Sequence, residues 1–180
     1  MRYYKLEDEI DYPSRWYLCG ITTEQGMHLY YDEAYSPSLT ANINQDGIPL
    51  DFTSSDDNFI PIVSELLMNV LNNRLDVIFI PTEIKGYYGY LKYYTMIATM
   101  IVDCVDEKKS EFNKFEVNDP VRPDKAGDYR AFFKLVIDKN KVLGKDIFRV
   151  ARSTNTLIIS ERIKNLLESE GFTGLKFKEV

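Results

Sequence analysis

The sequence predicts an α+β fold: a single domain with a mostly antiparallel sheet and at least two amphipathic helices. Two short stretches place apolar residues at helical spacing, and both open with Ser-Glu. Five to seven other stretches are short, rich in β-branched and aromatic residues, and separated by turn residues, as strands are. The clearest of these strand candidates is 131–138.

The two predicted helices begin at matching serines, Ser64 and Ser160, which stand 96 positions apart. Apolar residues follow the i, i+4, i+7, i+8 stripe of a helix with one buried face, at 63, 67, 70, 71 and again at 159, 163, 166, 167. A serine hydroxyl accepts a free backbone N–H at a helix start, and the glutamate after it suits the positive helix end. Gly171 is placed to end the second helix.

Each predicted helix is followed by a short strand candidate, at 77–81 and at 175–180. A Ser-Glu-helix-strand unit therefore occurs twice in the chain, which indicates a possible internal duplication. The alternative is chance, because short amphipathic helices resemble one another.

The remaining strands are expected where apolar and β-branched residues alternate or cluster, at 2–6, 16–21, 91–105, 131–138 and 147–150. The stretch 91–105 forms one long strand or two, with a helix as the alternative. Loops are expected where acidic residues, Pro or Gly gather, at 7–11, 32–58 and 106–125.

Bulk properties set limits on function. A length of 180 residues fits one domain, 1–180, whose first 48 residues are the less certain part. The net charge of −6 argues against nucleic-acid binding and suits a basic partner. The N-terminus does not read as a signal peptide, and the longest apolar run is too short to span a bilayer. We therefore expect a cytoplasmic protein with no membrane association.

Candidate catalytic groups are few. His28 is the single histidine, and the sequence shows no recognisable Ser–His–Asp or Cys–His catalytic arrangement that would use it. The distant cysteines Cys19 and Cys104 have no metal-ligand spacing, and Cys104 continues an apolar alternation typical of a core thiol. No enzyme activity, metal or cofactor is expected. The alternative is an enzyme of unrecognised type that uses carboxylates near Asp103 and Asp106, although a solvated strand end explains them more simply.

Two surfaces are candidates for binding a partner. One is the acidic run with its neighbouring tryptophan, comprising Glu7, Asp8, Glu9, Asp11 and Trp16. The other is the tyrosine cluster between positions 87 and 94, with Tyr87, Tyr88 and Tyr90 as the candidate contacts, since tyrosine is enriched at interfaces. A carbohydrate-binding or scaffold module is the alternative use of the tyrosines, and packing on a sheet is the simpler explanation.

Three segments of the chain, Asp146–Val150, Thr156–Lys164 and Gly171–Phe177, are similar to a family of predicted immunity proteins from bacterial polymorphic toxin systems, first catalogued as a domain of unknown function. The resemblance covers 49–180 and is best after 146. It implies a non-catalytic binding protein that neutralises a cognate bacterial toxin through a tight protein–protein complex. It brings no catalytic residues with it, and the toxin, on charge alone, is expected to be basic.

Overall fold

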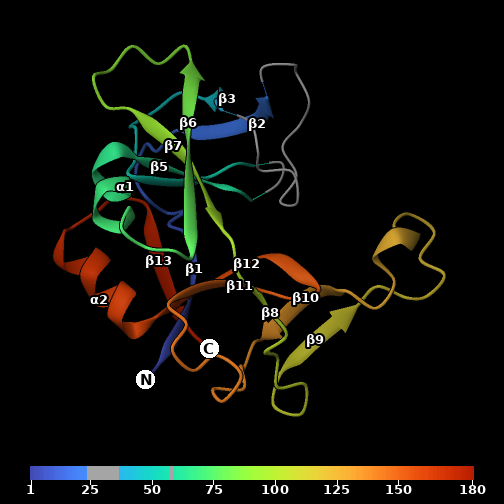
Figure 1. The fold of residues 1–180 in the computed structure, drawn as a ribbon. Helices are drawn as coiled ribbons and strands as arrows, with labels where there is room; N and C mark the ends of the chain where they lie inside the picture. Colours follow the sequence, from blue (N-terminus) through green and yellow to red (C-terminus); the bar gives the residue numbers. More distant parts are fainter. Residues whose placement is uncertain (24–36, 57–58) are drawn as a thin grey trace.

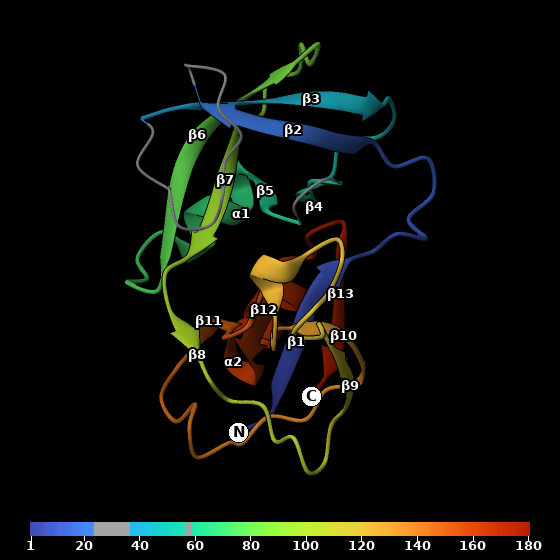
Figure 2. The same cartoon turned by 90° about the vertical axis from the view of Figure 1, so that its right-hand side faces the viewer.

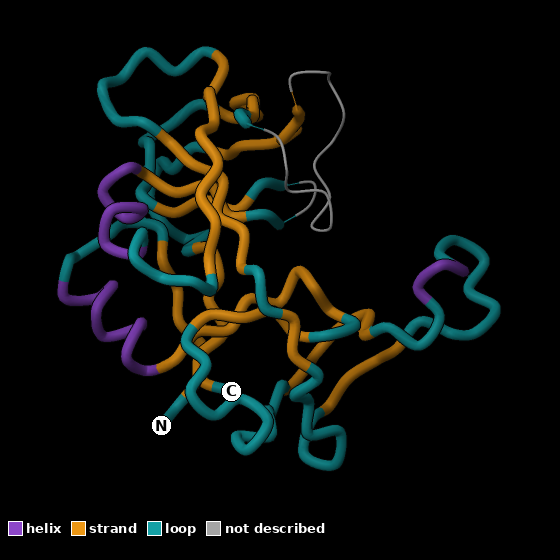
Figure 3. Tube along the Cα trace, viewed as in Figure 1, coloured by secondary structure: helices purple, strands orange, loops and turns teal. Residues whose placement is uncertain are grey.

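The computed structural model describes residues 1–23, 37–56 and 59–180, and strands dominate it (Figures 1 and 3). Within these ranges there are two α-helices, α1 (Glu65–Leu71) and α2 (Glu161–Ser169), and thirteen strands. The strands are β1 (Tyr3–Asp8), β2 (Tyr17–Thr23), β3 (Leu39–Gln45), β4 (Phe52–Ser54), β5 (Pro61–Ser64), β6 (Val77–Lys85), β7 (Tyr93–Ala98), β8 (Ile101–Val102), β9 (Glu111–Lys114), β10 (Tyr129–Lys134), β11 (Ile147–Val150), β12 (Ser153–Ser160) and β13 (Leu175–Glu179). The predicted α+β class is confirmed.

Three sheets organise these strands. The first has the order β2-β3-β6-β7-β5-β4, the second has the order β13-β1-β12-β11-β8, and β9 pairs with β10 in a separate two-stranded sheet. Every strand pair is antiparallel except β3 with β6 and β8 with β11. Figure 2 shows the first sheet above the second, and Figure 1 shows α1 and α2 on the same side of the molecule, with the β9–β10 hairpin extending away from it.

The predicted repeat is present and is larger than the sequence indicates. A hairpin precedes each helix (β4–β5 before α1, β11–β12 before α2), and a strand follows each (β6 and β13). Ser64 lies opposite Tyr93 of β7, and Ser160 lies opposite Tyr3 of β1. The N-terminal strand therefore completes the C-terminal unit. We call β4, β5, α1, β6 and β7 the first half, and β11, β12, α2, β13 and β1 the second half.

Both helices begin at the predicted serine. The Ser64 hydroxyl accepts the N–H of Leu67 at 3.3 Å and donates to the Asp51 carboxylate at 2.7 Å. The Ser160 hydroxyl accepts the N–H of Ile163 at 3.4 Å and donates to the Asp146 carboxylate at 2.6 Å. Each serine hydroxyl thus caps its helix while an aspartate just before the first strand of the hairpin holds it in position.

The two aspartates also join the halves. Asp51 of the first half accepts the backbone N–H and the hydroxyl of Thr173, at 3.0 and 2.8 Å, in the loop between α2 and β13. Asp146 of the second half accepts the Arg74 guanidinium at 2.6 Å, in the loop between α1 and β6. Asp76 in that same loop accepts the N–H of Ile147 at 2.9 Å. Each half therefore holds the helix–strand loop of the other.

The central apolar core lies between the halves and follows the same repeat. Equivalent positions contribute to it, in the same order: the half-buried Tyr94 with Met96, Val63, Leu67 and Leu71 from the first half, and Tyr4, Leu6, Ile159, Ile163 and Leu167 from the second. Two further clusters cover the outer faces of the two sheets. Burial of these faces supplies most of the driving force for folding.

Several predicted loops and strands differ from the structure. β1 continues to Asp8, so the acidic run begins inside a strand, and β3, β4 and β9 lie in segments predicted as loops. Strand β3 carries Asn and Gln at its exposed positions, and only Leu39 and Ala41 are fully buried, so its apolar alternation is too short to recognise. The stretch 91–105 contains two strands, β7 and β8.

Replacing Ile163 tests the helical phase and the shared core. Ile163 is fully buried between the halves, whereas Asn165 on the same helix is exposed. We expect Ile163→Asp to unfold the protein or to lower its stability by several kcal/mol, on the order of the cost of an unpaired buried charge. Asn165→Asp is the matched control and should stay near wild type. Equal melting temperatures of the two variants in a thermal scan would contradict the assignment.

The Asp146 carboxylate makes stability depend on pH. Burial alone would raise its pKa, but hydrogen bonds from Arg162, Ser160 and Arg74 outweigh burial and lower the pKa below the ordinary value of 3.8. The charged form therefore stabilises the fold above the unfolded-state pKa, and this contribution is lost as pH falls through the folded-state pKa. Asp146→Asn should cost about 1–3 kcal/mol at neutral pH. The loss of unfolding free energy in Asp146→Asn, relative to wild type, should become smaller in acid. A loss that stays constant down to about pH 2 would show that the charge of Asp146 does not cause it.

Candidate functional site

The tyrosine cluster divides between the interior and the surface. The rings of Tyr87 and Tyr93 pack against Trp16, with centroid distances of 5.6 and 5.1 Å, and against each other at 5.4 Å. Tyr88 and Tyr90 are 95% and 104% exposed in the loop between β6 and β7, which projects beyond the first sheet (Figure 1). Tyr88 and Tyr90 are therefore the fully exposed members of this cluster, whereas Tyr87 and Tyr94 are half-buried.

Trp16 does not lie on the surface, contrary to the expectation that it contributes to a contact. It is 1% exposed, and its indole N–H donates to the Thr53 hydroxyl at 2.9 Å. An aromatic residue beside an acidic run resembles an interface residue in sequence, but here the ring fills the space beneath Tyr87. Its role is to support the β6–β7 loop.

The acidic run, like the tyrosine cluster, divides between residues engaged in the fold and residues at the surface. Glu7 and Asp8 lie near the end of β1, and Glu9 and the exposed Asp11 lie in the loop beyond it. The Glu7 carboxylate pairs with Lys5 at 2.6 Å. Asp8 accepts the backbone N–H of Ser54 on both carboxylate oxygens, each at 3.0 Å, so it ties β1 of the second half to β4 of the first.

Beneath Asp8 lies a buried cation. The Arg15 side chain is 2% exposed; its guanidinium lies 3.4 Å from Asp8 and stacks over the Tyr17 ring at 4.7 Å. Burial raises the pKa of Asp8, and the hydrogen bonds from Ser54 and Arg15 only partly offset this effect. Because both polar partners of Asp8 belong to the fold, its carboxylate is first of all a structural group.

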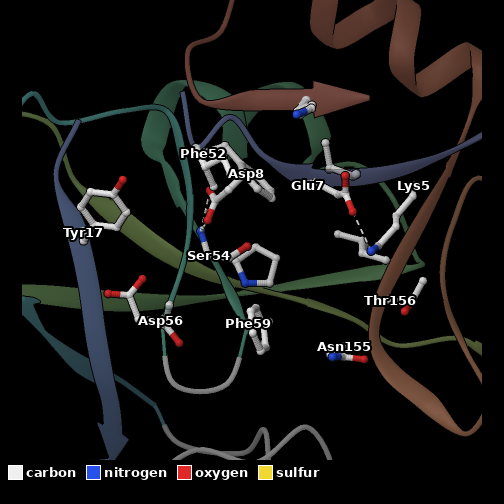
Figure 4. A pocket seen from close by; sticks show the side chains of 16 residues that line it. Lys5, Glu7, Asp8, Tyr17, Phe52, Ser54, Asp56, Phe59, Asn155 and Thr156 are labelled. Carbon is white, nitrogen blue, oxygen red and sulfur yellow. Dashed lines mark hydrogen bonds and ion pairs between the residues drawn. The ribbon is translucent and has the colours of Figure 1, made fainter. Parts of the chain in front are cut away.

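A groove of about 490 Å³ opens where the halves meet, on the side of Asp8 (Figure 4). We call it the inter-half groove. Residues of β1 and β12 form one wall, and residues of β2, β4 and the segment after β4 form the other. The lining combines apolar core side chains with carboxylates, among them Leu6, Phe52, Leu157, Glu7, Asp8 and Asp56. The groove thus collects two of the four predicted acidic residues, together with Asp56, which the sequence indicated only as a carboxylate preceding the first helix and not as a binding residue.

The carboxylates considered for catalysis are engaged in ion pairs. Asp106 pairs with Lys109 at 2.8 Å, and Asp103 lies 3.3 Å from Arg152. Glu107 pairs with Lys114 at 2.7 Å and accepts the Tyr129 hydroxyl at 2.6 Å. Hydrogen bonds from these lysines lower the pKa values of Asp106 and Glu107, opposite to the raised pKa of a general acid.

Other reactive groups add no site within the described residues. In 1–23, 37–56 and 59–180, no group of three or more His, Cys, Asp or Glu side chains is arranged to hold a metal ion. Cys104 is buried, and burial raises its thiol pKa to about 11, so it is the inert core thiol that the alternation predicts. His28 lies outside the described residues.

Comparison with protein families gives one match. The model of the immunity protein family Imm11 matches residues 2–180, and so includes the first 48 residues, for which the sequence segments alone indicated no family. A search of curated proteins finds no significant match. None of the helices in the described part of the chain is both long and apolar enough to cross a membrane.

The division between supporting and exposed aromatic residues can be tested by truncation. Trp16→Ala should lower stability by about 3–5 kcal/mol, because it removes a large buried ring. Tyr88→Ala should change stability by no more than about 0.5 kcal/mol, because that side chain is exposed. Urea denaturation of both variants measures this difference. A strongly destabilised Tyr88→Ala, or a neutral Trp16→Ala, would reverse the assignment.

Proposed function

The chain belongs to the Imm11 immunity protein family, and we propose that it neutralises a cognate bacterial toxin by binding it in a tight, stoichiometric, non-catalytic complex. The family match over residues 2–180 is the observation that carries this proposal. A binding protein of this kind needs a preformed surface and no reacting groups, so its site is an interface rather than an active centre.

The ion pairs at Asp103, Asp106 and Glu107 support a non-catalytic role. Each carboxylate is close to a lysine or arginine, so the cluster serves to fasten the loop between β8 and β9 and the β9–β10 hairpin. A carboxylate pair that works as acid and base instead needs pKa values that are pushed apart. The lowered pKa values of Asp106 and Glu107 do not provide that separation.

The acidic character of the chain favours a basic toxin. A net charge of −6 accelerates encounter with a positively charged partner by electrostatic steering, and salt weakens this effect. The proposed contacts are the exposed members of the predicted surfaces, namely Tyr88, Tyr90 and Asp11, together with the half-buried Glu7 and Glu9. Trp16 and Tyr87 support this surface from below. We place the encounter in the cytoplasm, following the expectation from the sequence.

Co-expression tests the proposed function. A tagged form of the protein is produced together with the product of the adjacent open reading frame, and host growth and co-purification are both recorded. The neighbour alone should stop growth, and the protein should restore growth and elute with the neighbour as a one-to-one complex. Ile163→Asp serves as a folding-defective control that should not rescue. A neighbour that is harmless and does not bind would contradict the proposal.

A further inference from the structure

We propose that the inter-half groove receives an arginine side chain of the partner toxin, with its guanidinium at Asp56 and against Phe59 and its alkyl stem along the apolar lining. This inference rests on the proposed function for the identity of the partner. The geometry of the groove, its aromatic residue at the mouth and its charge distribution each support it, and none of the three depends on the family match.

The groove has the shape and lining that a long cationic side chain requires. Its volume of about 490 Å³ exceeds that of a single side chain and leaves room for flanking residues of the partner. Leu6, Phe52 and Leu157, which belong to the central core, also line the groove. An arginine stem packs well on apolar surface while its head reaches polar groups at the rim, as long cationic side chains do.

Phe59 stands at the mouth of the groove in an unusual conformation (Figure 4). Its ring is 57% exposed, and its backbone has φ of 56°, a left-handed value that a bulky residue rarely adopts. The N–H of Phe59 donates to the Ser55 carbonyl at 2.9 Å, and the N–H of Ser55 donates to the Ile60 carbonyl at 3.0 Å. More than half of the Phe59 residue surface faces solvent, and a guanidinium can stack on the part of the ring that it exposes.

The three carboxylates of the groove differ in their polar partners. Glu7 has Lys5 as its partner, and Asp8 has the buried Arg15. Asp56 accepts a hydrogen bond from the neutral amide of Asn44 at 2.9 Å, and within 1–23, 37–56 and 59–180 no lysine or arginine forms an ion pair with it. Lys176 is the second lysine of the lining and lies opposite Glu7 in the pairing of β1 with β13.

An arginine of the partner complements this distribution better than a lysine does. The guanidinium is planar, donates two parallel hydrogen bonds to one carboxylate and stacks on an aromatic ring, whereas an ammonium is a compact and strongly hydrated charge. Closing the groove with the partner lowers the local dielectric constant, which strengthens the attraction to Asp56. Ile10, which is 61% exposed at the rim, then gains an apolar neighbour.

Charge reversal in the complex with the neighbouring gene product provides the first test. Asp56→Lys should raise the dissociation constant at least about tenfold. A loss of this order is expected when a good interfacial charge pair is broken. Glu111→Lys is the matched control: it makes the same change in net charge on β9, in the separate two-stranded sheet, and should stay within about twofold of wild type. Equal losses for both variants, or an unchanged affinity of Asp56→Lys, would overturn the groove assignment while the proposed function stands.

A probe that does not require the toxin separates the two proposals. The probe is the end-blocked dipeptide Phe-Arg, titrated into the isotope-labelled protein, and the neutral Phe-citrulline dipeptide is the control. Saturable shifts of the backbone amides of Ile10, Asp56 and Phe59 with the arginine form, and not with citrulline, would support the groove. Failure of the neighbour to bind would refute the proposed function alone. Failure of the arginine probe to shift these amides would refute the groove.

Discussion

The fold depends on a pair of reciprocal contacts in which each half of the chain holds the helix–strand loop of the other. Asp51 caps α1 through Ser64 and at the same time holds Thr173, and Asp146 caps α2 through Ser160 and at the same time holds Arg74. Each carboxylate therefore binds both the serine that caps its own helix and a residue of the other half. The helix cap of each half is thus fully held in place only when the other half is present. The shared apolar core between the halves adds the driving force, and the aspartates fix the relative position.

This arrangement also fixes the surface on which the proposed function relies. The inter-half groove takes its walls from both halves, so the reciprocal aspartates that set the spacing of the halves also set the width of the groove. Asp8 adds a third tie by bonding β1 to β4 at the groove itself. A site held by elements locked in this way is preformed, which reduces the entropy lost on binding and favours high affinity. The exposed tyrosines of the β6–β7 loop lie outside this frame and rest on Trp16 instead.

Local signals predicted the parts of the fold that are encoded locally. The serines that start α1 and α2, the strands after them and the core thiol of Cys104 follow from periodicity and capping, and all three are confirmed. The completion of the second half by β1 was not predictable, because it joins residues from opposite ends of the chain. Trp16 looked like an interface residue because a single sequence does not show which face of a loop is covered. The groove was not predicted either, because it brings together residues such as Asp8, Asp56 and Asn155 that are distant in sequence.

Hydrogen exchange of the complex with the neighbouring gene product would show directly which surface binds the toxin. We expect strong new protection in the segments that carry the groove and the exposed tyrosines, 5–11, 54–61 and 86–91, with little change in the β9–β10 hairpin. Protection confined to that hairpin or to the helical side would contradict the proposed interface. No protection anywhere, with both proteins present at high concentration, would contradict the account of this protein as one that neutralises a toxin by binding it.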